Sequence, residues 1–450
     1  MKTYQDFKQC TDRAAFLLEA ISEHRASVMY HIARDAEEYD RQRNVSILSY
    51  QKLLYTMSGK AVPDNYSANH KMASNFFNRF VNQQASYLLG NGMTLEKAEN
   101  KARLGRDFDT KLYQAARSAL VQGVCFGFWN YDHLEMFKLT EFVPLYDEET
   151  GALQAGIRFW QVDKDKPLRA TLYEQDGYTD YKQHEKELRE ENGKRTYVEL
   201  VHRSAADGEQ VEPWKNYPGF PMIPLYGNPH HQSELVGLRE NIDAYDLIKS
   251  GFANDLDDVS HIYWIMKNTG GMDEQDIAKF LNRINKTRVV DFPDGDDGAV
   301  AEPHTVDVPH DAREAALERL KNDMYEDFQA FNVSTLMGGQ KTATEIDAAY
   351  TPLDLKTDQF EYCVLDFLYG LFRIVGIEDN PTFKRNKIQN MNEQTQMVML
   401  AAAYLDDETI IGKLPWLTPE EVQQVLARKD AENLDRFNSN GLPMTETAGG

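Results

Sequence analysis

The sequence is poor in cysteine and lacks any arrangement of residues typical of a metal site. Its three cysteines, Cys10, Cys125 and Cys363, are far apart, and no CxxC pair or Cys/His cluster occurs. Neither a disulfide framework nor a zinc site is therefore expected. We predict a chain that needs no metal and no cofactor and that is made in a reducing compartment.

Long apolar runs are also missing. The first residues, MKTYQDFKQC, lack the apolar stretch of a secretory signal, and no run is long enough to cross a membrane. The sequence therefore predicts a soluble intracellular protein without a membrane partner.

Basic residues are outnumbered by acidic ones, 49 to 72, and the formal net charge is −23. A protein that grips nucleic acid through its phosphates normally has a basic face. An acidic chain can still handle DNA if it lets the duplex slide, because a like-charged wall gives the duplex no deep binding minimum. The commoner interpretation is that the acidity only keeps the protein in solution. Composition leaves both interpretations open.

Recognisable catalytic motifs are absent. The segment 338–342 (GGQKT) resembles the end of a phosphate-binding loop, but Gln340 stands where glycine is needed before the lysine. The acidic turn at 293–298 (PDGDDG) lacks the ligand alternation of a calcium loop. No signature of a serine hydrolase, zinc protease or deaminase occurs. We predict no enzyme, and we keep as the alternative a cytosolic enzyme on a helical scaffold with scattered catalytic residues.

The periodicity predicts an α+β fold that is predominantly helical. Helices are expected over 72–89, which ends at a Gly-Asn-Gly signal, and over 107–122. Short aromatic and β-branched segments then predict an antiparallel sheet at 124–130, 134–147, 153–163, 168–174 and 196–203. The charged stretch 183–195 is expected to be an exposed hairpin tip or loop.

Two long helices of matched length are predicted at 234–256 and 311–331, because apolar residues recur there every three or four positions. They flank a small α/β insert with extended pieces at 261–268, 287–292 and 299–308 and a helix at 273–285. This insert is too small to be stable alone, which suggests that it packs against copies of itself.

A glycine pair, Gly338-Gly339, follows the second long helix and predicts a mobile loop. A third helix is expected from Thr344 to Val375, with a kink near Tyr350 caused by Pro352. Further helices are expected over 390–404 and from Thr418, and the tail 438–450 is expected to be disordered.

Three segments carry a resemblance to a known family. They are NFFNRFVNQQASYLLGNGMTL (75–95), FVPLYDEETGALQAGIRFWQVDKD (142–165) and PMIPLYGNPHHQSELVGLRENIDAYDLIKSGFANDLDD (221–258). In this order, and together with the later helices, they resemble the portal proteins of tailed bacteriophages, in the family typified by the portal of phage SPP1. The resemblance covers roughly residues 30–435.

The resemblance implies a portal fold with wing, stem, clip and crown around a central channel. It implies the following division: wing 1–232, first stem helix 233–257, clip 258–310, second stem helix 311–332, tunnel loop 333–343, long kinked wing helix 344–376, crown 377–437 and disordered tail 438–450. Family members form rings, usually dodecameric, at one capsid vertex of the virion, and they are assembled in the host cytoplasm.

The resemblance also implies partners. Double-stranded DNA would pass through the ring without sequence specificity during packaging and ejection. The clip would dock the terminase large subunit and later the head–tail adaptor protein, while the wing and crown would face the major capsid and scaffold proteins.

Residue roles follow from this division. The tunnel loop would present Leu336, Met337, Gly338, Gly339, Gln340 and Lys341, and Lys341 is either a weak phosphate contact or a solvated lysine. Acidic residues of the stem would face the channel: Glu314, Glu318, Asp323 and Glu326, with Glu240, Asp243 and Asp246 as further candidates. The apolar stem positions are expected in the core or at the interface between subunits: Leu235, Leu238, Ile242, Tyr245, Leu317, Leu320, Met324 and Phe328.

Overall fold

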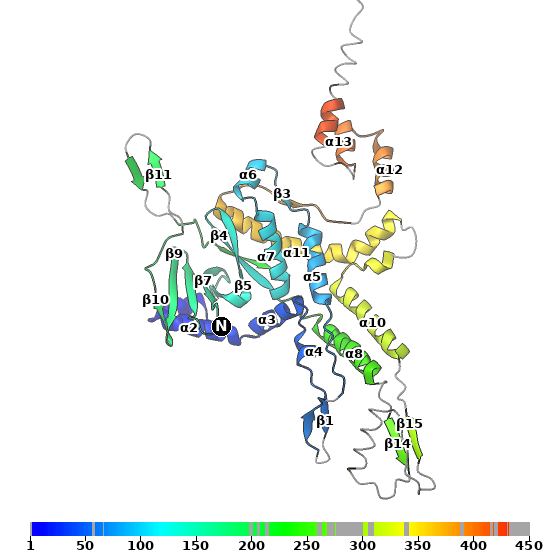
Figure 1. The fold of residues 1–450 in the computed structure, drawn as a ribbon. Coiled ribbons are helices and arrows are strands. Elements are labelled where there is room, and N and C mark those ends of the chain that lie inside the picture. The colour runs from blue at the N-terminus through cyan, green and yellow to red at the C-terminus, as the bar shows by residue number, and fades with distance from the viewer. Residues whose placement is uncertain are drawn as a thin grey trace, which may run out of the picture.

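The computed structural model describes residues 2–55, 59–65, 67–197, 201–204, 208–211, 216–258, 263–267, 275, 300–304, 310–336, 342–387, 391–414, 417, 422–429 and 431. A body of helices and two sheets carries a projecting helix pair, α8 and α10, at one end and the small helices α12 and α13 at the other (Figure 1). The fold is therefore α+β, as the sequence predicts.

Helices at the N-terminus precede a hairpin and a second set of helices. The first helices are α1 (Tyr4–Gln9), α2 (Arg13–Ala26), α3 (Val28–Asp40) and α4 (Val45–Ser49), and the hairpin consists of β1 (Leu53–Tyr55) and β2 (Ala61–Pro63). The second set of helices is α5 (Phe76–Leu89), α6 (Ala98–Arg103) and α7 (Phe108–Gln122), with the short strand β3 (Met93–Thr94) between α5 and α6. The prediction for α7 is confirmed. Helix α5 begins at Phe76 rather than at Met72, because residues 70–74 are hydrogen-bonded to α8 instead.

Two antiparallel sheets form the middle of the body. The first has the order β13 (Met222–Tyr226), β4 (Val124–Asn130), β5 (His133–Lys138), and the second β10 (Glu187–Glu190), β9 (Gly177–His184), β8 (Arg169–Glu174), β7 (Leu153–Trp160), β6 (Phe142–Tyr146). A separate hairpin pairs β11 (Val201–Ser204) with β12 (Gly208–Val211). The charged stretch 183–195, expected to be an exposed hairpin tip or loop, contains the tip of the β9–β10 hairpin at residues 185 and 186 and also the edge strand β10.

The C-terminal half contains α8 (Arg239–Asp258), β14 (Tyr263–Lys267), β15 (Val300–His304), α10 (His310–Phe328), a 3₁₀ turn at Val333–Leu336, α11 (Ala343–Val375), β16 (Thr382–Phe383), α12 (Met391–Ala401) and α13 (Asp407–Gly412). Strands β14 and β15 pair, which confirms two of the extended pieces predicted in the insert. Other predictions lie outside the described residues: the strand at 287–292, the helix at 273–285 except Gln275, the helix start at Thr418 and the tail 438–450.

Helix α11 is the longest helix and organises the largest core. Thr342 caps its N-terminus in a capping box with Glu345, and Gly376 ends it in a left-handed conformation. The helix continues past Pro352, so the kink stays a prediction. Phe367 of α11 packs on Gly127 of β4, where an added Cβ would come within 2.6 Å of the ring. Only glycine therefore allows this close contact between helix and sheet.

Candidate functional site

The helix pair α8/α10 is held together along its length. Asn241 Nδ2 donates to Asp327 Oδ2 (2.8 Å), and Arg313 forms an ion pair with Asp255. Residues early in α8 contact residues late in α10, and residues late in α8 contact residues early in α10. The chain therefore runs outward along α8 and returns along α10 (Figure 1).

Both helices are shorter than the sequence predicts, and in both the missing residues are at the end that meets the body. Residues 234–238 form turns, with Leu235 N bonded to Ser233 Oγ (3.1 Å), so α8 begins at Arg239. Helix α10 ends at Phe328 because Gln329 adopts a left-handed conformation (φ 61°) and breaks the helical path. Apolar spacing could not reveal either boundary, because the apolar residues are buried whether their backbone forms a helix or a turn.

The ends of the pair that meet the body are part of the core of the chain itself. Phe328 is 1% exposed and stacks on Phe80 of α5, with ring centroids 5.0 Å apart. The same core contains Leu235, Leu238, Ile242 and Met324. Five of the eight apolar positions predicted for the stem thus lie in an intramolecular core. Tyr245, Leu317 and Leu320 are only partly buried.

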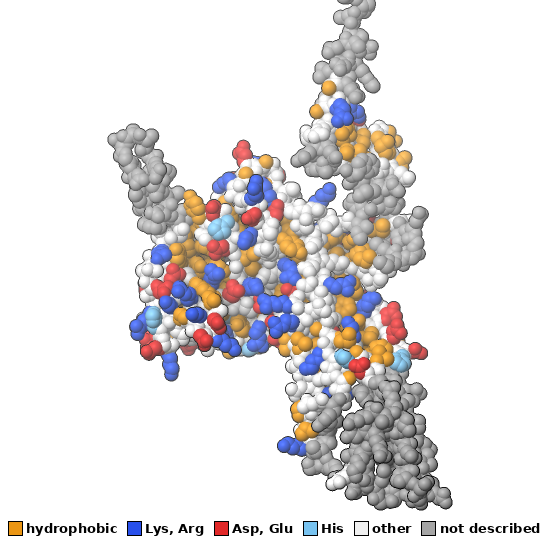
Figure 2. All heavy atoms as spheres, viewed as in Figure 1, with side chains coloured by type: hydrophobic (Ala, Val, Ile, Leu, Met, Phe, Trp, Pro, Cys, Tyr) orange, Lys and Arg blue, Asp and Glu red, His pale blue; other side chains and the backbone are white. Residues whose placement is uncertain are grey.

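The outer side of α10 is acidic. Glu314, Glu318 and Glu326 are exposed, and Asp323 is half-buried with a carboxylate oxygen 4.0 Å from Arg319 Nε. Figure 2 shows acidic side chains gathered along the outer side of α10. The described part of the chain therefore leaves the four predicted channel-facing acids at least partly open to solvent.

Two acidic residues of α8 have a different role from the one expected. Asp246 is fully buried and accepts hydrogen bonds from Ser74 N (2.9 Å) and from Asn44. Asp243 accepts from Ser46 Oγ (2.6 Å) and from the Tyr39 hydroxyl. Both carboxylates are thus used inside the chain, so Asp243 and Asp246 are withdrawn as candidates for lining the channel.

These carboxylates belong to a polar face of α8 that binds an extended segment. The backbone amides of His70, Met72 and Ser74 donate in turn to Asn254 Oδ1 (2.6 Å), Ser250 Oγ (2.9 Å) and Asp246 Oδ1. Burial raises the pKa of Asp246 despite these donors. Burial and the bond to Asp243 raise the pKa of Tyr39 to about 12.

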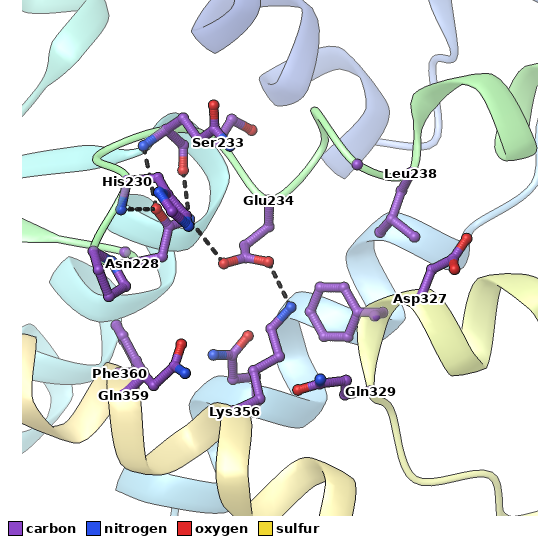
Figure 3. Close-up of a pocket in the computed structure, with 16 residues that line it drawn as sticks. Asn228, His230, Ser233, Glu234, Leu238, Asp327, Gln329, Lys356, Gln359 and Phe360 are labelled. Carbon is purple, nitrogen blue, oxygen red and sulfur yellow. Dashed lines mark hydrogen bonds and ion pairs between the residues drawn. The ribbon is translucent and has the colours of Figure 1, made fainter.

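A cavity of about 260 Å³ lies where the helix pair joins the body (Figure 3). Glu234 enters it from the segment before α8, and Lys356 enters it from α11. Lys356 Nζ lies 2.6 Å from Glu234 Oε2 and 3.6 Å from the centroid of the Phe328 ring. Asn228 Nδ2 donates to the other oxygen of Glu234 (2.9 Å). Lys356 therefore contacts the segment that leads into α8, through Glu234, and the last residue of α10, which is Phe328.

The Glu234–Lys356 pair is shielded from water, with side chains only 10% and 16% exposed. At such burial an ion pair depends on both partners, because either charge alone would be left desolvated. The sequence offers no signal for this contact, since 122 positions separate the two residues.

The chain leaving α10 is fixed once more before the predicted tunnel loop. The amide side chain of Gln83 both accepts from Phe331 N (3.1 Å) and donates to Phe331 O (2.8 Å). The Phe331 ring stacks on Tyr350 of α11 at 4.0 Å. Leu336 ends the 3₁₀ turn, and Met337, Gly338, Gly339, Gln340 and Lys341 lie outside the described residues.

Within the described ranges, no group of three or more His, Cys, Asp or Glu residues could hold a metal ion. Among the same residues, no helix is both long and apolar enough to span a membrane.

The family of the chain follows from comparison of its sequence with known proteins. Residues 30–434 match the family model described as "Phage portal protein, SPP1 Gp6-like". The chain belongs to this phage portal protein family, whose members are structural and non-enzymatic. The resemblance predicted from the sequence is thereby confirmed, and the enzyme alternative is set aside.

Two similar proteins are both named "Portal protein". One, from Clostridium phage phiCD119 (strain Clostridium difficile/United States/Govind/2006), is 26% identical over 226 residues, which are 48% of this chain and 50% of that protein. The other, from Bacillus phage SPP1, is 23% identical over 423 residues, which are 85% of this chain and 80% of that protein. The matched region thus spans half of the first relative and four-fifths of the second.

Proposed function

We propose that copies of this chain form a ring at one vertex of a phage capsid and that duplex DNA passes through the ring during packaging and ejection. The observation that carries the proposal is the exposed acidic side of α10, on a helix pair that projects from the body. A ring of such pairs presents a wall of like charge to the duplex, which prevents tight binding at any one position. Charges farther than about 10 Å are screened at 0.1 M salt, so the repulsion acts only near the wall.

The parts of the chain take their proposed roles from the family. Helices α8 and α10 form the stem, residues 258–310 the clip and residues 333–343 the tunnel loop. The clip docks the terminase large subunit and afterwards the head–tail adaptor. The body forms the wing and residues 377–437 the crown, and these face the major capsid and scaffold proteins. The ring is dodecameric, assembles in the host cytoplasm and resides in the virion.

Negative-stain images of the purified full-length protein test the ring. We expect closed rings with an axial hole wide enough for duplex DNA, because a projecting helix pair with one charged side suits a closed cyclic assembly. A preparation that contains only monomers or dimers at high protein concentration contradicts the proposal.

Charge reversal tests which surface lines the hole. We expect rings with Glu314→Lys and Glu318→Lys to bind linear duplex DNA and to lose about 10³-fold or more in affinity between 50 and 200 mM salt, since each ring then presents many cations to phosphates. The control, Glu149→Lys with Glu187→Lys, makes the same change of net charge at exposed positions of the wing. Equal DNA binding by the control, measured by gel shift, means that α10 does not line the channel.

A further inference from the structure

The longest helix has an apolar stripe on its outward face. The inward face of α11 is buried in the core through Leu353, Phe360, Val364, Phe367 and Leu371. On the opposite face, Leu355, Tyr362 and Tyr369 are 61%, 69% and 45% exposed. They recur every seven residues, so they form one nearly straight line about 21 Å long at 1.5 Å per residue. Single exposed apolar residues need no explanation, but an aligned set on one helix marks a contact surface.

This stripe has an acidic border. Asp358 and Asp366 are exposed beside it. Asp358 forms an ion pair with Arg385 (2.6 Å), whereas Asp366 has no ion pair within the described part of the chain. A partner surface that fits the stripe is therefore apolar in its middle and basic at its edges.

The chain itself has a surface of this kind at the start of α3. Val28 is 74% and Met29 42% exposed, and two exposed arginines flank them. Arg25 lies in the last turn of α2, over the Phe159 ring, and Arg34 lies in α3, 3.5 Å from Asp35. In Figure 1, α11 passes behind α5 and α7, whereas α3 runs along the side of the body nearer to the viewer. The two helices therefore lie apart within one chain, which allows each of them to meet a different neighbouring copy.

We propose that the outward face of α11 in one copy binds the start of α3 in the next copy. The inference rests on the proposed ring. A cyclic ring is closed by two different surfaces of each chain that fit one another, rather than by one surface that fits itself. Tyr362 and Tyr369 supply aromatic anchors of the type that dominates binding energy at interfaces, and the charges on the two sides are opposite.

Tyr362→Asp and Val28→Asp test the two sides of this contact. We expect either substitution to abolish rings and to leave monomers, as measured by sedimentation and negative-stain imaging, because each buries a carboxylate in an apolar contact. Val162→Asp is the matched control, since Val162 is 83% exposed on the wing and belongs to neither surface. Substitutions at exposed positions usually change the stability of a chain little. Far-UV circular dichroism spectra that match the wild type therefore show that the variants fold. If Tyr362→Asp does not fold, the double variant Tyr362→Ser, Tyr369→Ser replaces it.

Mixing the two variants tests whether the surfaces are partners. The Tyr362→Asp chain keeps an intact α3 surface, and the Val28→Asp chain keeps an intact α11 surface. One intact contact can form between them, so the mixture is expected to give dimers but no rings. Rings formed by either variant alone, or a mixture that stays monomeric, overturn the inference while leaving the ring itself intact. Wild-type protein that forms no rings would instead contradict the proposed function.

Discussion

Replacing Lys356 with methionine is expected to lower the free energy of unfolding by about 3–5 kcal/mol, since the change leaves the Glu234 carboxylate buried without its cation. Methionine keeps much of the length of lysine, and its thioether can still lie against the Phe328 ring. The loss therefore reports the missing charge more than a new cavity. Urea denaturation of the monomeric chain, followed by far-UV circular dichroism, measures it.

Three variants make this result interpretable. Lys356→Arg keeps the positive charge and should recover part of the stability. The double variant Glu234→Gln, Lys356→Met removes both charges and should be more stable than Lys356→Met alone.

Lys138→Met is the matched control: Lys138 Nζ lies 2.7 Å from Glu37, but its side chain is 42% exposed. Glu37 also keeps its bond from Gln122, so this loss should stay near 1 kcal/mol or below. Equal losses for Lys356→Met and Lys138→Met would show that the buried pair has no special role.

Phe328→Ala is expected to cost about 3–5 kcal/mol, the range for truncating a fully buried aromatic side chain. Phe328 stacks on Phe80 and lies beneath Lys356, so the cavity opens where the helix pair joins the body. Leu256→Ala, at a 52% exposed position of α8, is the control and should change stability by less than about 0.5 kcal/mol.

The same experiment separates a core role from an interface role. If Phe328 belongs to the core of one chain, the loss appears in the unfolding of the monomer. If the monomer keeps its stability and only the protein concentration needed for assembly rises, Phe328 acts between subunits. Its packing against Phe80 then does not stabilise the single chain.

Regular elements with strong local signals could be predicted from the sequence. The end of α7 is marked by Gly123, and the aromatic run that follows is β4, with the bounds expected from its composition. The family could also be recognised, because its motifs are contiguous segments. Both predictions depend on neighbours in the sequence, which periodicity and turn residues describe well.

Contacts between distant segments could not be predicted. Asp246 has the appearance of a surface residue on an amphipathic helix, yet the amide of Ser74 places it in the interior. Residues 72–74 continue the apolar pattern of the helix predicted at 72–89, and nothing in the sequence reveals that they bond to α8 instead. Similarly, Leu235 and Leu238 continue the apolar spacing of α8 although their backbone forms turns, because burial alone does not distinguish a turn from a helix.

The three amide bonds from residues 70–74 to α8 have a consequence for the order in which the chain folds during synthesis. The donors and acceptors are 172 to 184 positions apart. The amides of His70, Met72 and Ser74 therefore leave the ribosome long before Asp246, Ser250 and Asn254 are made, and we expect water to be their hydrogen-bond partner until then. Contacts of such long range slow folding, so this part of the body closes late, after the sheets between the two segments have been made.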